Sequence, residues 1–115
     1  MRAIADERLA PALRAMHADP SRRWSLADLA RVATMSRTTF VDRFRGAAGV
    51  PPMTYLQQWR VRLAERALRV GDTPIGQLAF ELGYGSESAF SSAFKRATGL
   101  SPRAFREAQR SLLAS

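Results

Sequence analysis

Two short runs of the chain carry side chains able to bind both base edges and phosphate groups. Arginine forms paired hydrogen bonds with guanine, valine can pack on the thymine methyl, and serine or lysine can bind phosphate oxygens. These residue types predict a nucleic-acid contact, and the alternative interpretation is an ordinary solvated helix face. The candidate residues are Ser36, Arg37, Thr38, Val41, Asp42 and Arg45 in the first run and Ser86, Glu87, Ser88, Ser91, Ser92 and Lys95 in the second.

The two runs differ in what we expect them to contact. In the first run, we expect Arg37 to bind guanine and Val41 to touch a thymine methyl in the major groove. Asp42 has two open roles, as an acceptor from a cytosine amino group or as an ion-pair partner of a neighbouring arginine. The second run carries mostly short side chains. We therefore expect its serine hydroxyls and its helix start to contact mainly phosphates.

The overall charge balance favours an anionic partner. The 115 residues include 18 Lys and Arg against 10 Asp and Glu, which gives a net charge of +8. Such a chain attracts nucleic acid, an acidic membrane surface or an acidic protein, and composition alone does not choose among them. No apolar run reaches the roughly 18–20 residues of a membrane span, and no secretory signal is recognisable. The sequence therefore predicts a soluble protein.

No residue set typical of an enzyme is present in the sequence. Cysteine is absent, which excludes disulfides, thiolate metal sites and cysteine nucleophiles. His17 is the only histidine, so a histidine metal site is not expected. No Ser-His-Asp set and no pair of carboxylates typical of a catalytic site is recognisable. Gly83-Tyr84-Gly85 lacks the third glycine of a dinucleotide-binding loop and belongs to a turn. We expect no catalytic activity, no metal and no cofactor.

The spacing of apolar residues, three and four positions apart, predicts an all-α fold. A first helix is expected over residues 4–18. A capping box at Ser25 and Asp28 starts a short second helix, and Ser36 caps a third helix that ends at Gly49.

A long helix is expected to link two halves of the chain. Pro52 fits the first turn of a helix that ends near Val70 and is about 27 Å long. The expected organisation is residues 1–51 with the first helix pair, 52–70 as the linker helix and 71–115 with a second pair.

The second half of the chain repeats the first half. Residues 26–30 match residues 75–79 at an offset of 49, whereas Phe40 and Phe44 match Phe90 and Phe94 at an offset of 50. One residue is therefore inserted in the second turn, around residues 83–85. Each unit is a helix, a tight turn and a second helix, which is the pattern of a helix-turn-helix motif.

On these motifs the chain resembles the DNA-binding domain of the AraC/XylS family of bacterial transcription regulators, over about Trp24 to Arg106. The residues that carry the resemblance in the second motif are Ala79, Gly83, Tyr84, Ser88, Phe90, Phe94-Lys95-Arg96, Gly99-Leu100-Ser101-Pro102 and Phe105-Arg106. Those in the linker helix are Tyr55-Leu56, Trp59-Arg60-Val61, Ala64 and Ala67-Leu68.

The resemblance implies two helix-turn-helix subdomains joined by a rigid linker helix, with two recognition helices in successive major-groove segments of duplex DNA. It also implies sequence-specific binding in transcription regulation, in the cytoplasm at the bacterial nucleoid. The alternative function is a basic protein-interaction module that docks on RNA polymerase or another acidic partner. RNA polymerase is an expected partner under either hypothesis. An effector or dimerisation domain has no room in this chain, which is either a natural monomeric regulator or a fragment of a longer one; we expect the fragment.

Three positions depart from the family pattern. Asp42 and Ser92 stand where relatives often carry arginine, which argues against an arginine-to-guanine contact from either position. Thr34 stands where many relatives carry glycine in the first turn. A positive φ there would store strain of about 1 kcal/mol in a β-branched residue.

The remaining arginines and aromatics have simpler expected roles. Six arginines of the long helix and the following region could line the phosphates of DNA. Arg60 could instead reach a carboxylate or carbonyl between the two halves of the chain. The six are Arg60, Arg62, Arg66, Arg69, Arg103 and Arg106. The aromatic residues fit core positions better than stacking platforms for single-stranded bases. They are Trp24, Phe40, Phe44, Phe90, Phe94 and Phe105.

Overall fold

The computed structural model describes residues 4–114 and is built of α-helices, with no strand in that range. A short 3-10 helix, Glu7–Leu9, precedes the first α-helix. The α-helices are α1 (Ala10–Ala18), α2 (Leu26–Val32), α3 (Arg37–Ala48), α4 (Pro52–Val70), α5 (Ile75–Glu81), α6 (Glu87–Thr98) and α7 (Pro102–Ala114). The predicted all-α class is confirmed, and the predicted ends of α4 agree with the structure. Residues 1–3 and 115 of the predicted terminal segments lie outside the described residues.

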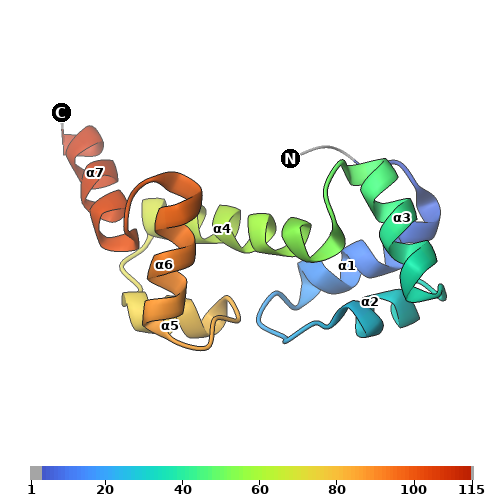
Figure 1. Ribbon diagram of the computed structural model, residues 1–115. Helices are drawn as coiled ribbons and strands as arrows, with labels where there is room; N and C mark the ends of the chain where they lie inside the picture. Colours follow the sequence, from blue (N-terminus) through green and yellow to red (C-terminus); the bar gives the residue numbers. More distant parts are fainter. Residues whose placement is uncertain (1–3, 115) are drawn as a thin grey trace. The chain divides into compact units, whose positions relative to one another are not determined.

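The chain divides into two compact units, Met1–Trp59 and Arg60–Ser115. The boundary falls inside α4, so the first part of this helix belongs to one unit and the second part to the other. Figure 1 shows the repeated motif in each unit: α2 and α3 joined by a tight turn in the first, and α5 and α6 in the second.

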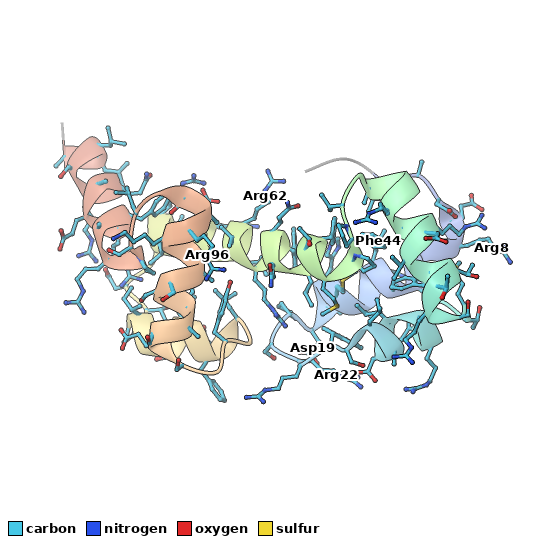
Figure 2. The ribbon with its side chains drawn as sticks, in the orientation of Figure 1. Arg8, Asp19, Arg22, Phe44, Arg62 and Arg96 are labelled. Carbon is cyan, nitrogen blue, oxygen red and sulfur yellow. The ribbon has the colours of Figure 1, made fainter. Side chains whose placement is uncertain are left out.

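The core of the first unit forms where helices α1 to α3 and the start of α4 bury their apolar faces. Phe40 and Phe44 are fully buried on α3, and the Phe44 ring packs edge-on against Tyr55 of α4, with 5.4 Å between ring centroids. Figure 2 labels Phe44 on this inner side. Leu56 is also fully buried. Trp24, Phe40 and Phe44 are therefore core, as predicted, and are not available to stack on bases.

The second unit repeats this arrangement with its own core. Phe90 and Phe94 are fully buried on α6, and Phe94 packs edge-on against Phe105 of α7 at 5.3 Å. Leu68 of α4 is 2% exposed. The predicted core role of the second aromatic set is therefore confirmed.

The helix ends follow the predicted local signals. Ser25 and Asp28 form both bonds of a capping box at the start of α2, and these bonds lower the pKa of the Asp28 carboxyl. Helices α3 and α6 end at Gly49 and Gly99, which have φ of 82° and 87°. A left-handed residue at this place satisfies the last helical carbonyls, and glycine adopts it without a steric penalty.

The turn between the two helices of each motif is also duplicated. Met35 N–H donates to the carbonyl of Ala30 in the first turn, and Tyr84 N–H donates to the carbonyl of Ala79 in the second, both at 2.9 Å. Thr34 has φ 57°, where the second turn has Gly83 at 87°, so the condition for strain at this β-branched residue is met. The 49-residue offset holds through Tyr84, so the inserted residue is Gly85.

The predicted first helix over residues 4–18 is too long. Helical structure begins with the 3-10 turn at Glu7, and the α-helix begins only at Ala10. Asp6 has extended backbone and caps the 3-10 turn by accepting from Arg8 N–H, while its other oxygen accepts from Arg43 Nε at 2.8 Å. These bonds lower the pKa of Asp6. The α-helix begins only at Ala10 because Pro11 has no backbone N–H and is tolerated only in the first turn of a helix.

Candidate nucleic-acid interface

The first candidate surface is the face of α3 opposite its buried aromatic rings. Phe40 and Phe44 fix the inner face of this helix, so residues offset from them by a half-turn must face outward. Arg37, Thr38, Asp42 and Arg45 are all exposed, and Val41 is half-buried. Thr38, Asp42 and Arg45 therefore share the outer face of α3, with Val41 at its edge. Arg37 lies three residues before Phe40, on the same side of the helix as the rings, and is exposed because it is the first residue of α3.

Ser36 has a structural task within this surface. It is the N-cap of α3, where its hydroxyl oxygen accepts from Thr39 N–H at 3.2 Å and its hydroxyl group donates to Thr39 Oγ1 at 2.9 Å. The capped helix start lies beside Arg37, the first residue of α3. A cap of this kind fixes the direction in which the first turn points.

The second candidate surface is the equivalent face of α6. Glu87, Ser88, Ser92 and Lys95 are exposed and Ser91 is half-buried. Ser86 is the N-cap of α6, and its hydroxyl oxygen accepts from Ala89 N–H at 3.0 Å. Ser88, Ser92 and Lys95 therefore share the outer face of α6. Glu87 lies three residues before Phe90, on the side of the buried rings, and its carboxylate is close to Gly76 of α5. The serine cap stands at the same place as in α3.

Opposite charges occupy equivalent positions at the start of the two helices. Arg37 of α3 corresponds to Glu87 of α6 at the offset of 50 residues. Arginine donates to guanine and to phosphate, whereas a carboxylate only accepts and is repelled by phosphate. The two surfaces therefore cannot make the same contacts at their leading position.

Two roles were left open for Asp42, a cytosine acceptor and an arginine partner. The structure does not form the second: the Asp42 carboxylate makes no ion pair and no hydrogen bond with an arginine of residues 4–114. The neighbouring Arg43 pairs with Asp6. The exposed Asp42 carboxylate is therefore available to accept a hydrogen bond from a ligand.

Two exposed side chains of these helices were missed by the sequence analysis. Thr39 on α3 and Arg96 on α6 are both exposed, and Figure 2 labels Arg96. Arg96 follows Lys95 directly and adds a second cation to the end of α6. The Lys95-Arg96 pair in the sequence was a signal that could have included it.

Of the six arginines expected to line phosphates, four are exposed and two, Arg60 and Arg106, are wholly or partly buried. Arg62, Arg66, Arg69 and Arg103 are exposed, and Figure 2 shows Arg62 extending away from α4. Arg69 pairs with Glu65 at 3.5 Å.

Arg106 was expected at the surface, and this expectation is wrong. It is only 9% exposed, and its guanidinium group donates to the carbonyl oxygen of Thr73 at 2.6 Å. Arg60 is half-buried beside Tyr84, and burial lowers the pKa of Arg60 and raises that of Tyr84.

The single histidine packs against aromatic side chains. The His17 ring lies 4.3 Å from the Trp59 ring, between centroids, and its Nε2 is 3.0 Å from the Tyr55 hydroxyl. Burial lowers the pKa of His17. Within the described part of the chain, no three His, Cys, Asp or Glu side chains are grouped as a metal site would require.

No helix among residues 4–114 combines the length and apolar character that crossing a bilayer requires.

Comparison with protein families gives a match over residues 29–108 to a family described as a helix-turn-helix domain. An AraC-like transcription regulator of Streptomyces lividans is 46% identical over 104 residues, which are 90% of this chain and 34% of that protein. The regulator AlkR of Acinetobacter baylyi is 41% identical over 105 residues, which are 91% of this chain and 34% of that protein. The chain thus spans about a third of the length of these curated relatives.

Solved structures show the same likeness. The DNA-binding domain of AdpA, described as a global transcriptional factor and crystallised in complex with a target DNA, is 33% identical and superposes with a TM-score of 0.87. The match covers 92% of this chain and 96% of that one. An AraC-type regulator from Chromobacterium violaceum is 25% identical, with a TM-score of 0.81 over 89% of this chain and 91% of the other.

Proposed function

The chain belongs to the helix-turn-helix family of AraC-type DNA-binding domains, and from this premise we propose that it binds duplex DNA sequence-specifically in bacterial transcription regulation. The observation that carries the proposal is the close likeness to the AdpA domain, which was crystallised with its target DNA. The exposed polar faces of α3 and α6 support it, because each presents hydrogen-bonding side chains outward from a buried aromatic core.

Within this proposal, α3 contacts base edges and α6 mainly contacts phosphate groups of the DNA backbone. Arg37 binds guanine, Val41 contacts a thymine methyl, and Asp42 accepts from a cytosine amino group. Ser88, Ser91 and Ser92, together with Lys95, have side chains suited to phosphate oxygens. Both helices enter the major groove, which is the docking mode of recognition helices in helix-turn-helix proteins.

Electrostatics supplies much of the affinity in such a complex. If roughly 6–8 phosphates are neutralised, the logarithm of the binding constant should fall with the logarithm of salt concentration with a slope of about −5 to −7. Titration of a fluorescent duplex at several salt concentrations measures this slope. A slope near zero would contradict duplex binding through phosphates.

We also propose RNA polymerase as a protein partner and the bacterial nucleoid as the site of action. Apolar side chains exposed in the second unit support a protein contact: Phe80 is 79% exposed and Leu113 is 79% exposed. A Phe80→Ser variant tests the contact, with DNA affinity unchanged and activation of transcription by purified RNA polymerase reduced. Unchanged activation would exclude Phe80 from the contact.

A further inference from the structure

The second unit contains a pocket lined by three arginines. Its volume is about 450 Å³, and its lining comes from the start of α5, the start of α6 and one face of α7. The lining residues are Pro74, Ile75, Gly76, Glu87, Arg103, Arg106, Glu107 and Arg110.

One of these arginines is buried without a counter-charge. Arg106 is 9% exposed, and its one hydrogen bond in the structure goes to a neutral carbonyl, that of Thr73. Its Nε is buried and has no hydrogen-bond partner, and Arg106 forms no ion pair with any residue of the range 4–114. Burying a charge away from water is unfavourable unless an opposite charge or hydrogen bonds compensate it, and the hydrogen bond to Thr73 leaves the Arg106 Nε unpaired.

The helical scaffold does not require a charge at this position. At the offset of 50 residues Arg106 corresponds to Leu56, and at the offset of 49 Thr73 corresponds to Trp24. Leu56 is fully buried and Trp24 is 9% exposed, so apolar side chains fill this place in the first unit. The second unit has replaced an apolar pair by an arginine and a threonine beside an open pocket.

The other two arginines of the pocket differ in their partners. Arg110 donates to the exposed Asp72, which balances its charge. Arg103 is exposed and has no ion-pair or hydrogen-bond partner in the described part of the chain. Glu87 and Glu107 also line the pocket, so the case for an anion rests on Arg103 and Arg106, the two guanidinium groups that form no ion pair in residues 4–114. Guanidinium groups bind phosphate through paired, charge-assisted hydrogen bonds.

We propose that this pocket binds one phosphate group of the DNA backbone, next to the groove that receives α6. The inference rests on the proposed function. In helix-turn-helix complexes the start of the recognition helix lies at the groove and the preceding helix crosses the backbone. The pocket lies between Gly76 of α5 and Glu87 of α6, the second residue of one helix and the first of the other. A backbone phosphate that flanks the groove meets Arg103 at the surface, with the charge of Arg106 beneath it.

The first experiment tests the pocket without DNA. Inorganic phosphate is titrated into the protein while the arginine Nε–Hε resonances are followed by NMR. We expect saturable shifts of Arg103 and Arg106 in the wild type and loss of saturation in Arg103→Gln. Shifts that are linear and equal for all arginines, including the exposed Arg14 of α1, would overturn the phosphate site.

The second experiment tests whether the phosphate belongs to DNA. Arg103→Gln should weaken binding about three- to tenfold on the best site and on random duplex alike, and should reduce the salt slope by about 1. Arg14→Gln, a matched loss of one exposed arginine, should change affinity less than twofold. Glu87→Gln should raise affinity for random duplex, because it removes a carboxylate from the pocket. Equal effects of Arg103→Gln and Arg14→Gln would overturn the DNA-backbone assignment.

A third variant makes the second unit like the first. Arg106→Leu introduces the residue that the first unit has at the equivalent position, and circular dichroism reports whether it folds. The folded variant should lose saturable phosphate binding. Retained saturable binding would remove Arg106 from the site, and if the variant does not fold, the Arg103→Gln result decides alone.

The outcomes separate the pocket from the proposed function. Wild-type protein that does not bind duplex DNA would contradict the proposed function, whatever the phosphate titration shows. Saturable phosphate binding combined with an Arg103→Gln variant of normal DNA affinity would instead assign the pocket to a free phosphate compound and overturn the DNA-backbone source.

Discussion

The two units share one scaffold but differ in the chemistry they place on it. Both bury two aromatic rings four residues apart on the recognition helix, both cap that helix with serine, and both end it at a left-handed glycine. The first unit presents Arg37 at the start of this helix and the second presents Glu87. Duplication has therefore kept the residues that build the fold, while the exposed positions have diverged.

The interiors diverge at one place as well. The start of α2 is closed by the Ser25–Asp28 capping box and the buried Trp24. The start of α5 has Pro74 as its N-cap, with no side-chain cap, and an open pocket beside it. The two units thus differ at the start of the first helix of each motif: α2 is capped and closed, whereas α5 has no side-chain cap and lies beside a pocket.

The largest expected effect tests the shared part of the comparison. Phe44→Ala and Phe94→Ala remove equivalent, fully buried rings, and each should lower the free energy of unfolding of its unit by about 3–5 kcal/mol. Chemical denaturation, combined with amide hydrogen exchange to follow each unit, measures both losses. A loss below about 1 kcal/mol for either variant would show that the two cores are not equivalent.

The next effect tests the difference between the two exposed faces. Arg37→Ala should weaken binding to the best DNA site by about 1–3 kcal/mol and binding to random duplex much less, because a base contact is lost. Glu87→Ala should leave discrimination between the two duplexes unchanged. Competition titrations with specific and random duplexes measure both. Equal losses on both duplexes for Arg37→Ala would make Arg37 a phosphate contact.

The smallest effect concerns the turns. Thr34→Gly relieves about 1 kcal/mol of backbone strain but costs a similar amount through the greater freedom of glycine in the unfolded chain, so stability should change by less than about 0.5 kcal/mol. Gly83→Thr places a β-branched residue at φ 87° and should destabilise the protein by about 1 kcal/mol or more. Thermal unfolding of the two variants provides the measurement. A stabilising Gly83→Thr substitution would show that the turns are not equivalent.

Local signals in the sequence predicted most of the fold. The capping box at Ser25, the glycine stops at Gly49 and Gly99, and the four-residue spacing of the aromatics all depend on neighbours within one helix turn, and the structure contains each of them.

The two errors have different causes. The first α-helix begins at Ala10 because of Pro11, a local signal that apolar spacing alone does not include. The burial of Arg106 depends on the carbonyl of Thr73, 33 residues away, and a contact between such distant residues cannot be predicted from apolar spacing.

For the candidate site, the sequence predicted the helix faces but not their details. The amphipathic pattern placed Asp42 and Lys95 opposite the aromatic rings, and both are exposed. Arg37 and Glu87 stand three residues before a buried ring and are exposed as the first residues of their helices. The roles of these side chains toward DNA remain predictions. The charged pocket was not predicted, because its lining comes from three helices that meet only in the folded unit.

Selection of bound sites from random duplex DNA tests the central claim most directly. The account predicts an enriched site with strong base preference, including guanine, over the segment that α3 contacts, and weak preference over the segment that α6 contacts. Repeating the selection with Arg37→Ala should remove the guanine preference and leave the rest. Absence of any enriched site, or strong base preference that survives in the Arg37→Ala variant, would contradict an account in which α3 reads the sequence and α6 holds the backbone.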